Sequence, residues 1–241
     1  MRTGNPALGG NTFSSVGSVS PENAMTIQGT ANKTLILLVF VVGAALWAWS
    51  KPMEFMPWFL WIVGGGFVLS LITIFVKQAA PVTAPLYALV EGVVIGCISF
   101  FFEKLYPGIV IQAVGLTFGT LFALLLAYQS RIIKVTQNFR LGVIAATGGI
   151  ALYYLASMVL SGFFKIQVPL IHESTPLGIG FSVVVVVIAA LNLVLDFDFI
   201  ERGAQANAPK YMEWYGAFGL MVTLIWLYLE ILRLLAKTRR R

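Results

Sequence analysis

Seven long apolar runs follow one another along the chain, and a short polar separator closes each of them. The runs lie at about 34–50, 57–76, 83–102, 108–128, 141–164, 176–198 and 211–236. Each separator carries charge, proline or glycine, as in "KQAAP" and "ERGAQANAPK". Roughly 20 apolar residues in a helix cross about 30 Å of hydrocarbon, and the runs are continuous rather than alternating as barrel strands would be. The pattern therefore predicts one all-α bundle of seven transmembrane helices over residues 33–236.

Composition agrees with a membrane protein. Of the 241 residues, 59% are apolar and 11% are charged, whereas soluble domains are about 25% charged. The single cysteine, Cys97, excludes an internal disulfide, and the single histidine, His172, lies in a polar separator where it is expected to be solvated. The net charge of +6 comes from Lys and Arg that flank the apolar runs. This distribution indicates a lipid bilayer as the partner and not nucleic acid.

The two ends differ from the apolar middle. Residues 1–32 are polar and almost uncharged, which predicts a mobile N-terminal tail, and residues 237–241 form a basic C-terminal tail. Seven spans gather most basic residues on the side of the N-terminus, which predicts a cytoplasmic N-terminus. The basic end "LRLLAKTRRR" would then lie outside. Either this end is tolerated there, or one segment is re-entrant.

Small residues indicate where helices approach closely. Gly92 and Gly96 form a GxxxG pattern in the third run, and glycines also gather at Gly64–Gly66 and Thr147–Gly149. We expect close helix packing at these positions.

Two aspartates near the end of the sixth run carry the candidate chemistry. An ionisable residue within a span costs about 2.5–3.5 kcal/mol and usually marks a functional site. Asp196 and Asp198 are two residues apart, so a helix turns them about 200° from each other. Asp198 precedes Arg202 by one turn, which predicts a salt bridge at the rim. Asp196 shares its face with Asn192 and Ala189 and is expected to point into the bundle.

Glu213, near the start of the seventh run, is the expected partner of Asp196 if the two lie at similar depth. Two carboxylates in a dry site would share a proton and form a latch that pH opens. The alternative is a surface ion pair of Glu213 with Lys210. Glu91, in the middle of the third run, should face other helices or water, and Lys77 is its conceivable partner.

The remaining polar residues suggest no catalytic site. Glu230 lies three residues before Arg233, which predicts a local ion pair. H-E-x-x-H, G-x-S-x-G and aspartyl-protease patterns do not occur. We therefore expect a protein that is not an enzyme and that holds no metal or cofactor.

Several stretches resemble Bax inhibitor-1/YccA-type membrane proteins of the bacterial branch. The most specific are "GIGFSVVVVVIAALNLVLDFDFIERG" and "APKYMEWYGAFGLMVTLIWLYLEILRLL". The resemblance implies six helices around a central seventh, and a location in the bacterial inner membrane. It also implies a pH-sensitive calcium leak in some members and a stress-related or protease-regulating role in others.

The resemblance assigns particular residues as well. Asp196 matches the aspartate that ends the sixth helix in leak members, with Asp198 as its polar follower, and Lys77 is the nearest match to a basic residue at that site. The second aspartate of the family, inside the seventh helix, falls at Thr223. Either Glu213 replaces it from another turn, or the two-aspartate latch is absent.

Two functions follow as hypotheses. The first is a passive, pH-gated leak for cations such as Ca²⁺, which would be transported and not retained. The second is a non-conducting regulator that binds a membrane protease or another membrane protein through the tail 1–32 and the basic end 237–241.

Overall fold

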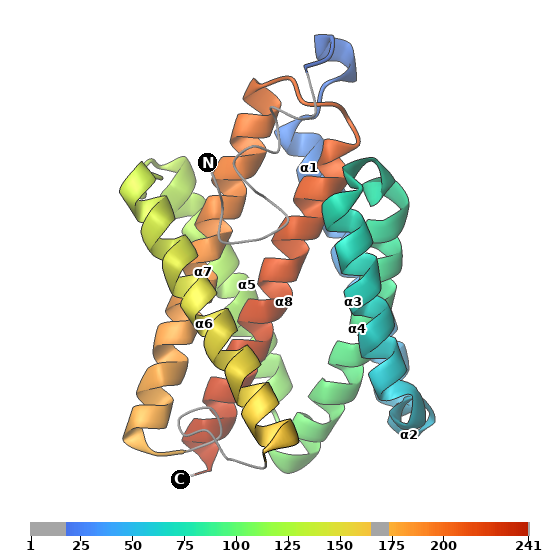
Figure 1. Ribbon diagram of the computed structural model, residues 1–241, viewed down its shortest axis with the longest axis vertical. Helices are drawn as coiled ribbons and strands as arrows, with labels where there is room; N and C mark the ends of the chain where they lie inside the picture. The colour runs from blue at the N-terminus through green and yellow to red at the C-terminus, as the bar shows by residue number, and fades with distance from the viewer. Residues whose placement is uncertain (1–17, 165–173, 241) are drawn as a thin grey trace.

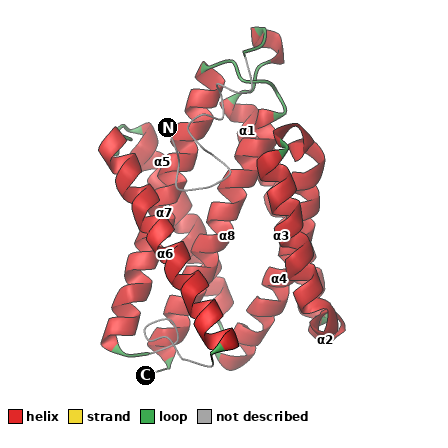
Figure 2. Ribbon diagram, viewed as in Figure 1, coloured by secondary structure: helices red, strands yellow, loops and turns green. Residues whose placement is uncertain are grey.

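The computed structural model describes residues 18–164 and 174–240, and within them the chain is a bundle of helices without strands (Figures 1 and 2). Seven helical segments in these ranges are long and apolar enough to cross a membrane. The predicted all-α, seven-span membrane fold is confirmed.

The spans follow the apolar runs closely. The first is α1 (Ile27–Ser50), and the second combines α2 (Pro52–Phe55), the short helix η3 (Met56–Trp58) and α3 (Phe59–Phe75). The short helix η4 (Lys77–Ala79) leads into α4 (Ala80–Leu105). The remaining spans are α5 (Ile109–Gln129), α6 (Gln137–Phe163), α7 (Pro176–Gln205) and α8 (Met212–Arg239).

Local sequence signals start several of these helices. The threonine before each of α1, α6 and α7 accepts a hydrogen bond from a backbone N–H in the first turn, and these N-caps are Thr26, Thr136 and Thr175. Proline occupies the first position of α2 and α7, where its missing N–H costs nothing.

The predicted N-terminal tail is too long by several residues. Helix α1 begins at Ile27, so residues 27–32 are helical. Before it, the backbone is bonded to the α7–α8 connection: Val19 N donates to Asn207 O at 3.0 Å, and Met25 N donates to Ala208 O at 2.7 Å. The part of the predicted tail from residue 18 onward is therefore held against the bundle.

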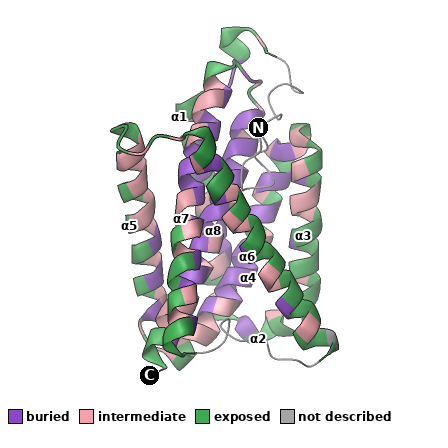
Figure 3. Ribbon diagram, turned by 60° about the vertical axis from the view of Figure 1, so that its left-hand side comes forward, coloured by how far each residue is buried: buried purple, intermediate pink, exposed green. Residues whose placement is uncertain are grey.

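The helix α8 is the centre of the bundle, as the family resemblance implied. It is buried along most of its length and contacts α1, α4, α5 and α7 (Figure 3). In Figure 1 it runs in red between α7 on one side and the α3–α4 pair on the other. By contrast, α6 packs mainly on α7 and lies at the outside.

The GxxxG pattern marks the close contact of α4 with α1. A Cβ at Gly92 would lie 2.5 Å from the carbonyl oxygen of Val41, and one at Gly96 would overlap the backbone of Ala45. Close packing here is confirmed. The same expectation was wrong for most of the other glycines, where a Cβ would meet no atom of another described residue within 4 Å: Gly64, Gly65, Gly148 and Gly149.

Candidate functional site

The contacts between α7 and α8 fix the depth of each candidate residue. The rings of Phe199 and Tyr215 lie 6.4 Å apart, and a Cβ on Gly216 would lie 3.4 Å from Ile200. The two helices run antiparallel, so at any level the number of a residue on α7 and the number of the residue that faces it on α8 add up to about 415. Asp196 is therefore level with residues around 219 of the central helix.

Asp196 is fully buried on α7, with an exposed fraction of 0%. One turn deeper on the same face, Asn192 is 2% exposed, and its amide nitrogen donates to Thr147 Oγ1 of α6 at 2.8 Å and to Ile188 O at 2.8 Å. The amide oxygen of Asn192 has no hydrogen-bond partner among the described residues. Asp196 thus occupies the inward position expected from its spacing.

Thr223 lies on α8 about one turn from the level of Asp196. It is 3% exposed, and its hydroxyl donates to Gly219 O at 3.2 Å. The sequence of α8 has no carboxylate between Glu213 and Glu230. About one turn from the level of Asp196, the central helix therefore has the hydroxyl of Thr223 at the position where the family resemblance implies a second aspartate.

Glu213 is not the partner of Asp196, and the expected shared depth was wrong. It is the second residue of α8, whereas α7 continues for nine residues after Asp196, so about 10 Å along the helix axis separates them. Glu213 instead forms a buried ion pair with Lys33 of α1. Its Oε1 also accepts from the N–H and the hydroxyl of Thr26, at 2.9 and 3.0 Å. Glu213 therefore pairs with Lys33 and not with Lys210, which was the alternative prediction.

At the rim, the predicted pair of Asp198 with Arg202 is present, and Arg140 of α6 joins it. Asp198 Oδ2 lies 2.8 Å from Arg202 Nη2 and 2.7 Å from Arg140 Nη2. The side chains of Asp198 and Arg140 are only 14% and 9% exposed, so the triad is largely shielded from solvent. The sequence does contain a signal for Arg140. With seven spans, the fourth connection, which ends at Arg140, lies on the same side of the membrane as the sixth connection, which follows Asp198.

A second charged group lies one turn further along α7. Glu201 pairs with Arg131 at 3.0 Å and accepts hydrogen bonds from Gln205 and from the hydroxyl of Tyr128. Together with Asp198, Arg202 and the loop after α5, these residues line a cavity of about 310 Å³. The sequence analysis did not predict this cavity.

Glu91 and Lys77 do not meet. Glu91 interacts with the hydroxyl of Tyr87, and its carboxylate lies 3.5 Å from where a Cβ on Gly66 of α3 would be. Lys77 is fourteen residues earlier in the same span, about 20 Å away along the axis, so the expected pair was wrong. Lys77 lies in η4, which contacts the central helix α8.

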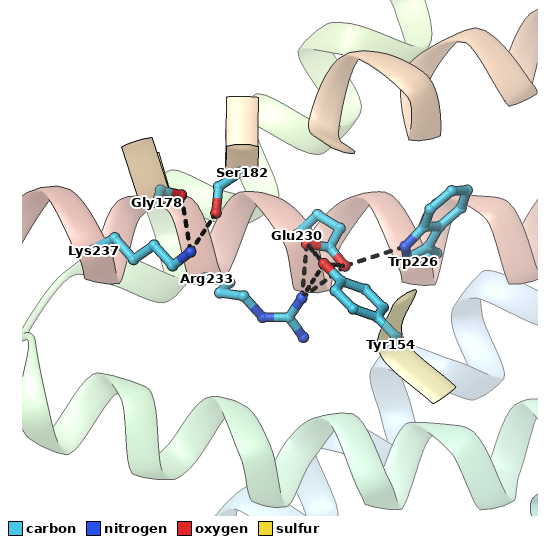
Figure 4. A network of polar contacts seen from close by, with 7 residues as sticks. All are labelled: Tyr154, Gly178, Ser182, Trp226, Glu230, Arg233 and Lys237. Carbon is cyan, nitrogen blue, oxygen red and sulfur yellow. Dashed lines mark hydrogen bonds and ion pairs between the residues drawn. The ribbon is translucent and has the colours of Figure 1, made fainter. Parts of the chain in front are cut away.

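Figure 4 shows a polar network at the opposite end of α8. Glu230 is 2% exposed and lies 2.9 Å from Arg233 Nη1, which is the predicted local pair. It also accepts from Tyr154 of α6 at 3.1 Å and from Trp226 Nε1 at 3.2 Å. The network joins the outer helix α6 to the central helix.

The predicted basic tail from residue 237 onward belongs to α8 through Arg239. Lys237 is 5% exposed, and its ammonium donates to Gly178 O at 3.0 Å and to Ser182 Oγ at 2.8 Å (Figure 4). Arg239 donates to Pro107 O at 2.8 Å. These cations complement the C-terminal end of the helix dipole, which gives the basic end a structural role.

Among residues 18–164 and 174–240, no group of three or more His, Cys, Asp or Glu side chains is placed to hold a metal ion. His172 lies outside these ranges.

Fold and site together define a polytopic membrane protein whose last helix is enclosed by the others and whose acidic side chains are buried beside it. The chain belongs to the Bax inhibitor 1 like family, whose model matches residues 5–240. Comparisons with curated proteins and with solved structures gave no match.

Proposed function

We propose that the protein provides a pH-sensitive pathway for cations, Ca²⁺ included, along the α7–α8 interface, with Asp196 as the titrating group. The observation that carries the proposal is the fully buried carboxyl of Asp196 beside the central membrane helix. A carboxyl at such depth costs about 2.5–3.5 kcal/mol on insertion. Packing alone does not require that cost, because an apolar side chain would fill the same volume.

Oxygen atoms line the proposed route in sequence. The proposed route begins in the rim cavity, which Asp198 and Glu201 line. It then passes to the opposite face of α7, which carries Asp196 and, one turn deeper, the amide oxygen of Asn192. The hydroxyl of Thr223 lies on the facing helix. Carboxylate and carbonyl oxygens are the ligands that Ca²⁺ prefers.

The rim triad is the proposed gate. The guanidinium groups of Arg140 and Arg202 meet at Asp198, between Asp196 and the end of α7. While the triad is closed, the positive charges of Arg140 and Arg202 lie at the entrance and repel an incoming cation. Other titratable or charged groups on the helices around this region act on the same equilibrium: Lys33, Lys77, Tyr87, Glu91, Tyr128, Arg131, Glu213 and Tyr215.

The test is calcium flux into liposomes that contain the purified protein and a calcium dye, measured between about pH 6 and 8. Asp196→Asn keeps the shape and removes the titrating group, so its flux should not respond to pH. Asp198→Asn removes the carboxylate of the proposed gate, so it should change the size of the flux but retain its pH response. Flux that is absent at every pH overturns the proposal, and an equal change of the pH response in both variants overturns the assignment to Asp196.

Asp198→Asn should also lower the stability of the fold. Breaking one side of a buried ion pair costs about 3–5 kcal/mol, and the slight exposure of Asp198 puts Asp198→Asn near the lower value. A thermal unfolding curve at each pH separates this loss of stability from a loss of flux.

The second hypothesis, a non-conducting regulator that binds a membrane protease, draws less support from the described residues. Lys237 and Arg239 bond within the bundle, and residues 19–25 bond to the α7–α8 connection. Absence of flux together with one consistent cross-linked partner in native membranes would favour it.

We further propose a bacterial inner membrane with the N-terminus in the cytoplasm. The start of α1 lies at the same end of the bundle as the connection from α7 to α8 (Figure 1). The rim triad lies near this connection, so the gate would face the cytoplasm. The excess of Lys and Arg on this side supports that orientation. Labelling of cysteines placed in the connections, in cells with an intact membrane, tests it.

A further inference from the structure

An apolar slot runs between α1 and α5 and reaches the central helix. These two helices flank α8 without packing closely against each other. A cavity of about 510 Å³ between them is lined by Leu38, Leu121, Leu125 and, from the α7–α8 pair, Ile200 and Leu220. A second cavity, of about 330 Å³, shares Leu38 with the first and continues along α8 to Tyr228.

The length of the first cavity matches one leaflet of a bilayer. On α5 it extends from Phe118 to Gln129, which is eleven helical rises or about 16 Å. Half of the hydrocarbon core is about 15 Å. The slot is therefore long enough to hold one acyl chain of this leaflet.

The rim end of the slot is polar and rich in cations. Tyr128, Arg131 and Glu201 line both the slot and the adjoining 310 Å³ cavity, where Lys134 and Arg202 add two more cations. Three basic residues thus face two carboxylates, Asp198 being the other one. The side chain of Arg131 is 70% exposed, although it pairs with Glu201, so it can also reach an anion at the membrane surface.

We propose that this slot binds one anionic phospholipid of the rim-side leaflet. One acyl chain lies between α1 and α5 against α8, and the headgroup phosphate lies at Arg131 and Lys134. Charge complementarity supports an anionic headgroup, because a guanidinium binds phosphate through two parallel hydrogen bonds and basic pockets between membrane helices select such lipids. Since Glu201 bonds to Arg131 at the entrance of the proposed cation route, the lipid would compete with the carboxylate for the same guanidinium.

Native mass spectrometry of the full chain, with phosphatidylglycerol or phosphatidylcholine added, tests the proposal. We expect one retained lipid per chain and at least a five-fold preference for phosphatidylglycerol. Leu121→Trp fills the slot and should abolish retention, while the matched Leu152→Trp on the exposed side of α6 should not. Equal retention by both tryptophan variants overturns the slot.

The headgroup has its own test. Arg131→Gln combined with Lys134→Gln should keep the bound lipid and remove the preference for phosphatidylglycerol. Lys210→Gln, on the same membrane side but outside the slot, should keep the preference. A preference that survives in the double variant overturns the assignment of the headgroup.

A second measurement does not depend on filling the slot. A benzophenone amino acid at Leu38, inside the slot, should photo-cross-link to phosphatidylglycerol in nanodiscs much more than one at Leu152 does. Equal lipid adducts at both positions would indicate bulk lipid only. An adduct of Leu38 with a protein segment would show that the slot has another occupant, and both results overturn the proposal.

Discussion

Glu213→Gln should destabilise the folded protein and leave the pH response of any flux unchanged. The carboxylate of Glu213 is 1% exposed and is held by Lys33 and by two hydrogen bonds from Thr26 at the start of α1. A hydrogen bond to a charged group contributes about 1.5–3 kcal/mol. Because Lys33 is 19% exposed and can turn towards water, we expect a loss of about 2 kcal/mol, below the range for fully buried pairs.

Thermal unfolding in detergent, followed by tryptophan fluorescence, measures this loss. By the scaling for chains of 150–250 residues, 2 kcal/mol corresponds to a fall in Tm of about 4–8 °C. A Tm within 1 °C of the wild type would refute the structural role of Glu213. A flux that loses its pH response in this variant would restore Glu213 as a partner of Asp196.

Gly29→Ala tests the same contact without changing any charge. A Cβ on Gly29 would overlap the carboxylate of Glu213, which could move only by leaving Lys33 and Thr26. Gly43→Ala is the matched control in the same helix, since a Cβ there meets nothing within 4 Å. It should gain up to about 1 kcal/mol from helix propensity, whereas Gly29→Ala should lower the Tm. Equal shifts would refute the close contact.

Three further substitutions test the packing around α8 and α4, each by its unfolding temperature. Gly96→Ala should cost about 1–3 kcal/mol, because its Cβ would overlap the backbone of α1, while Gly64→Ala, with open space around it, should cost nothing. Tyr154→Phe removes a hydrogen bond to the buried Glu230 and should cost about 1.5 kcal/mol and raise hydrogen exchange in α6. Lys237→Met leaves two buried acceptors on α7 without their donor and should cost about 1–3 kcal/mol.

The fold was predictable because hydropathy dictates it. Seven apolar runs of sufficient length must span a bilayer as helices, and a GxxxG pattern allows close approach at Gly92 and Gly96. Local spacing also sufficed for Asp198 with Arg202 and for Glu230 with Arg233, since pairs three or four residues apart share a helix face. Gly148 is also a small residue in a helix, but a Cβ on it would meet no atom of the other described residues within 4 Å. A glycine in the sequence therefore does not by itself indicate a close helix contact.

The error in the depth of Glu213 came from helix ends. The polar residues after Asp198 suggest the end of an apolar span, yet the helix continues to Gln205, outside the apolar stretch. Asp196 therefore lies deeper in the bundle than the apolar run indicates, while Glu213 stays in the first turn of α8. Hydropathy reports where lipid begins, but it does not report where a helix stops.

The contacts that the sequence could not indicate are those that join distant segments. Arg140 and Asp198 are separated by 58 residues, and Lys33 and Glu213 by 180. Both ion pairs lie at the rim end of the α7–α8 hairpin, one tying α6 to α7 and the other tying α1 to α8. If α7 and α8 open at this end, both pairs stay intact only when α6 moves with α7 and α1 moves with α8. Two substitutions distinguish the roles of these ion pairs. Asp198→Asn breaks the pair that holds α6 to α7, and Glu213→Gln breaks the pair that holds α1 to α8. The variant with the larger flux identifies which of the helices α6 and α1 moves when the pathway opens.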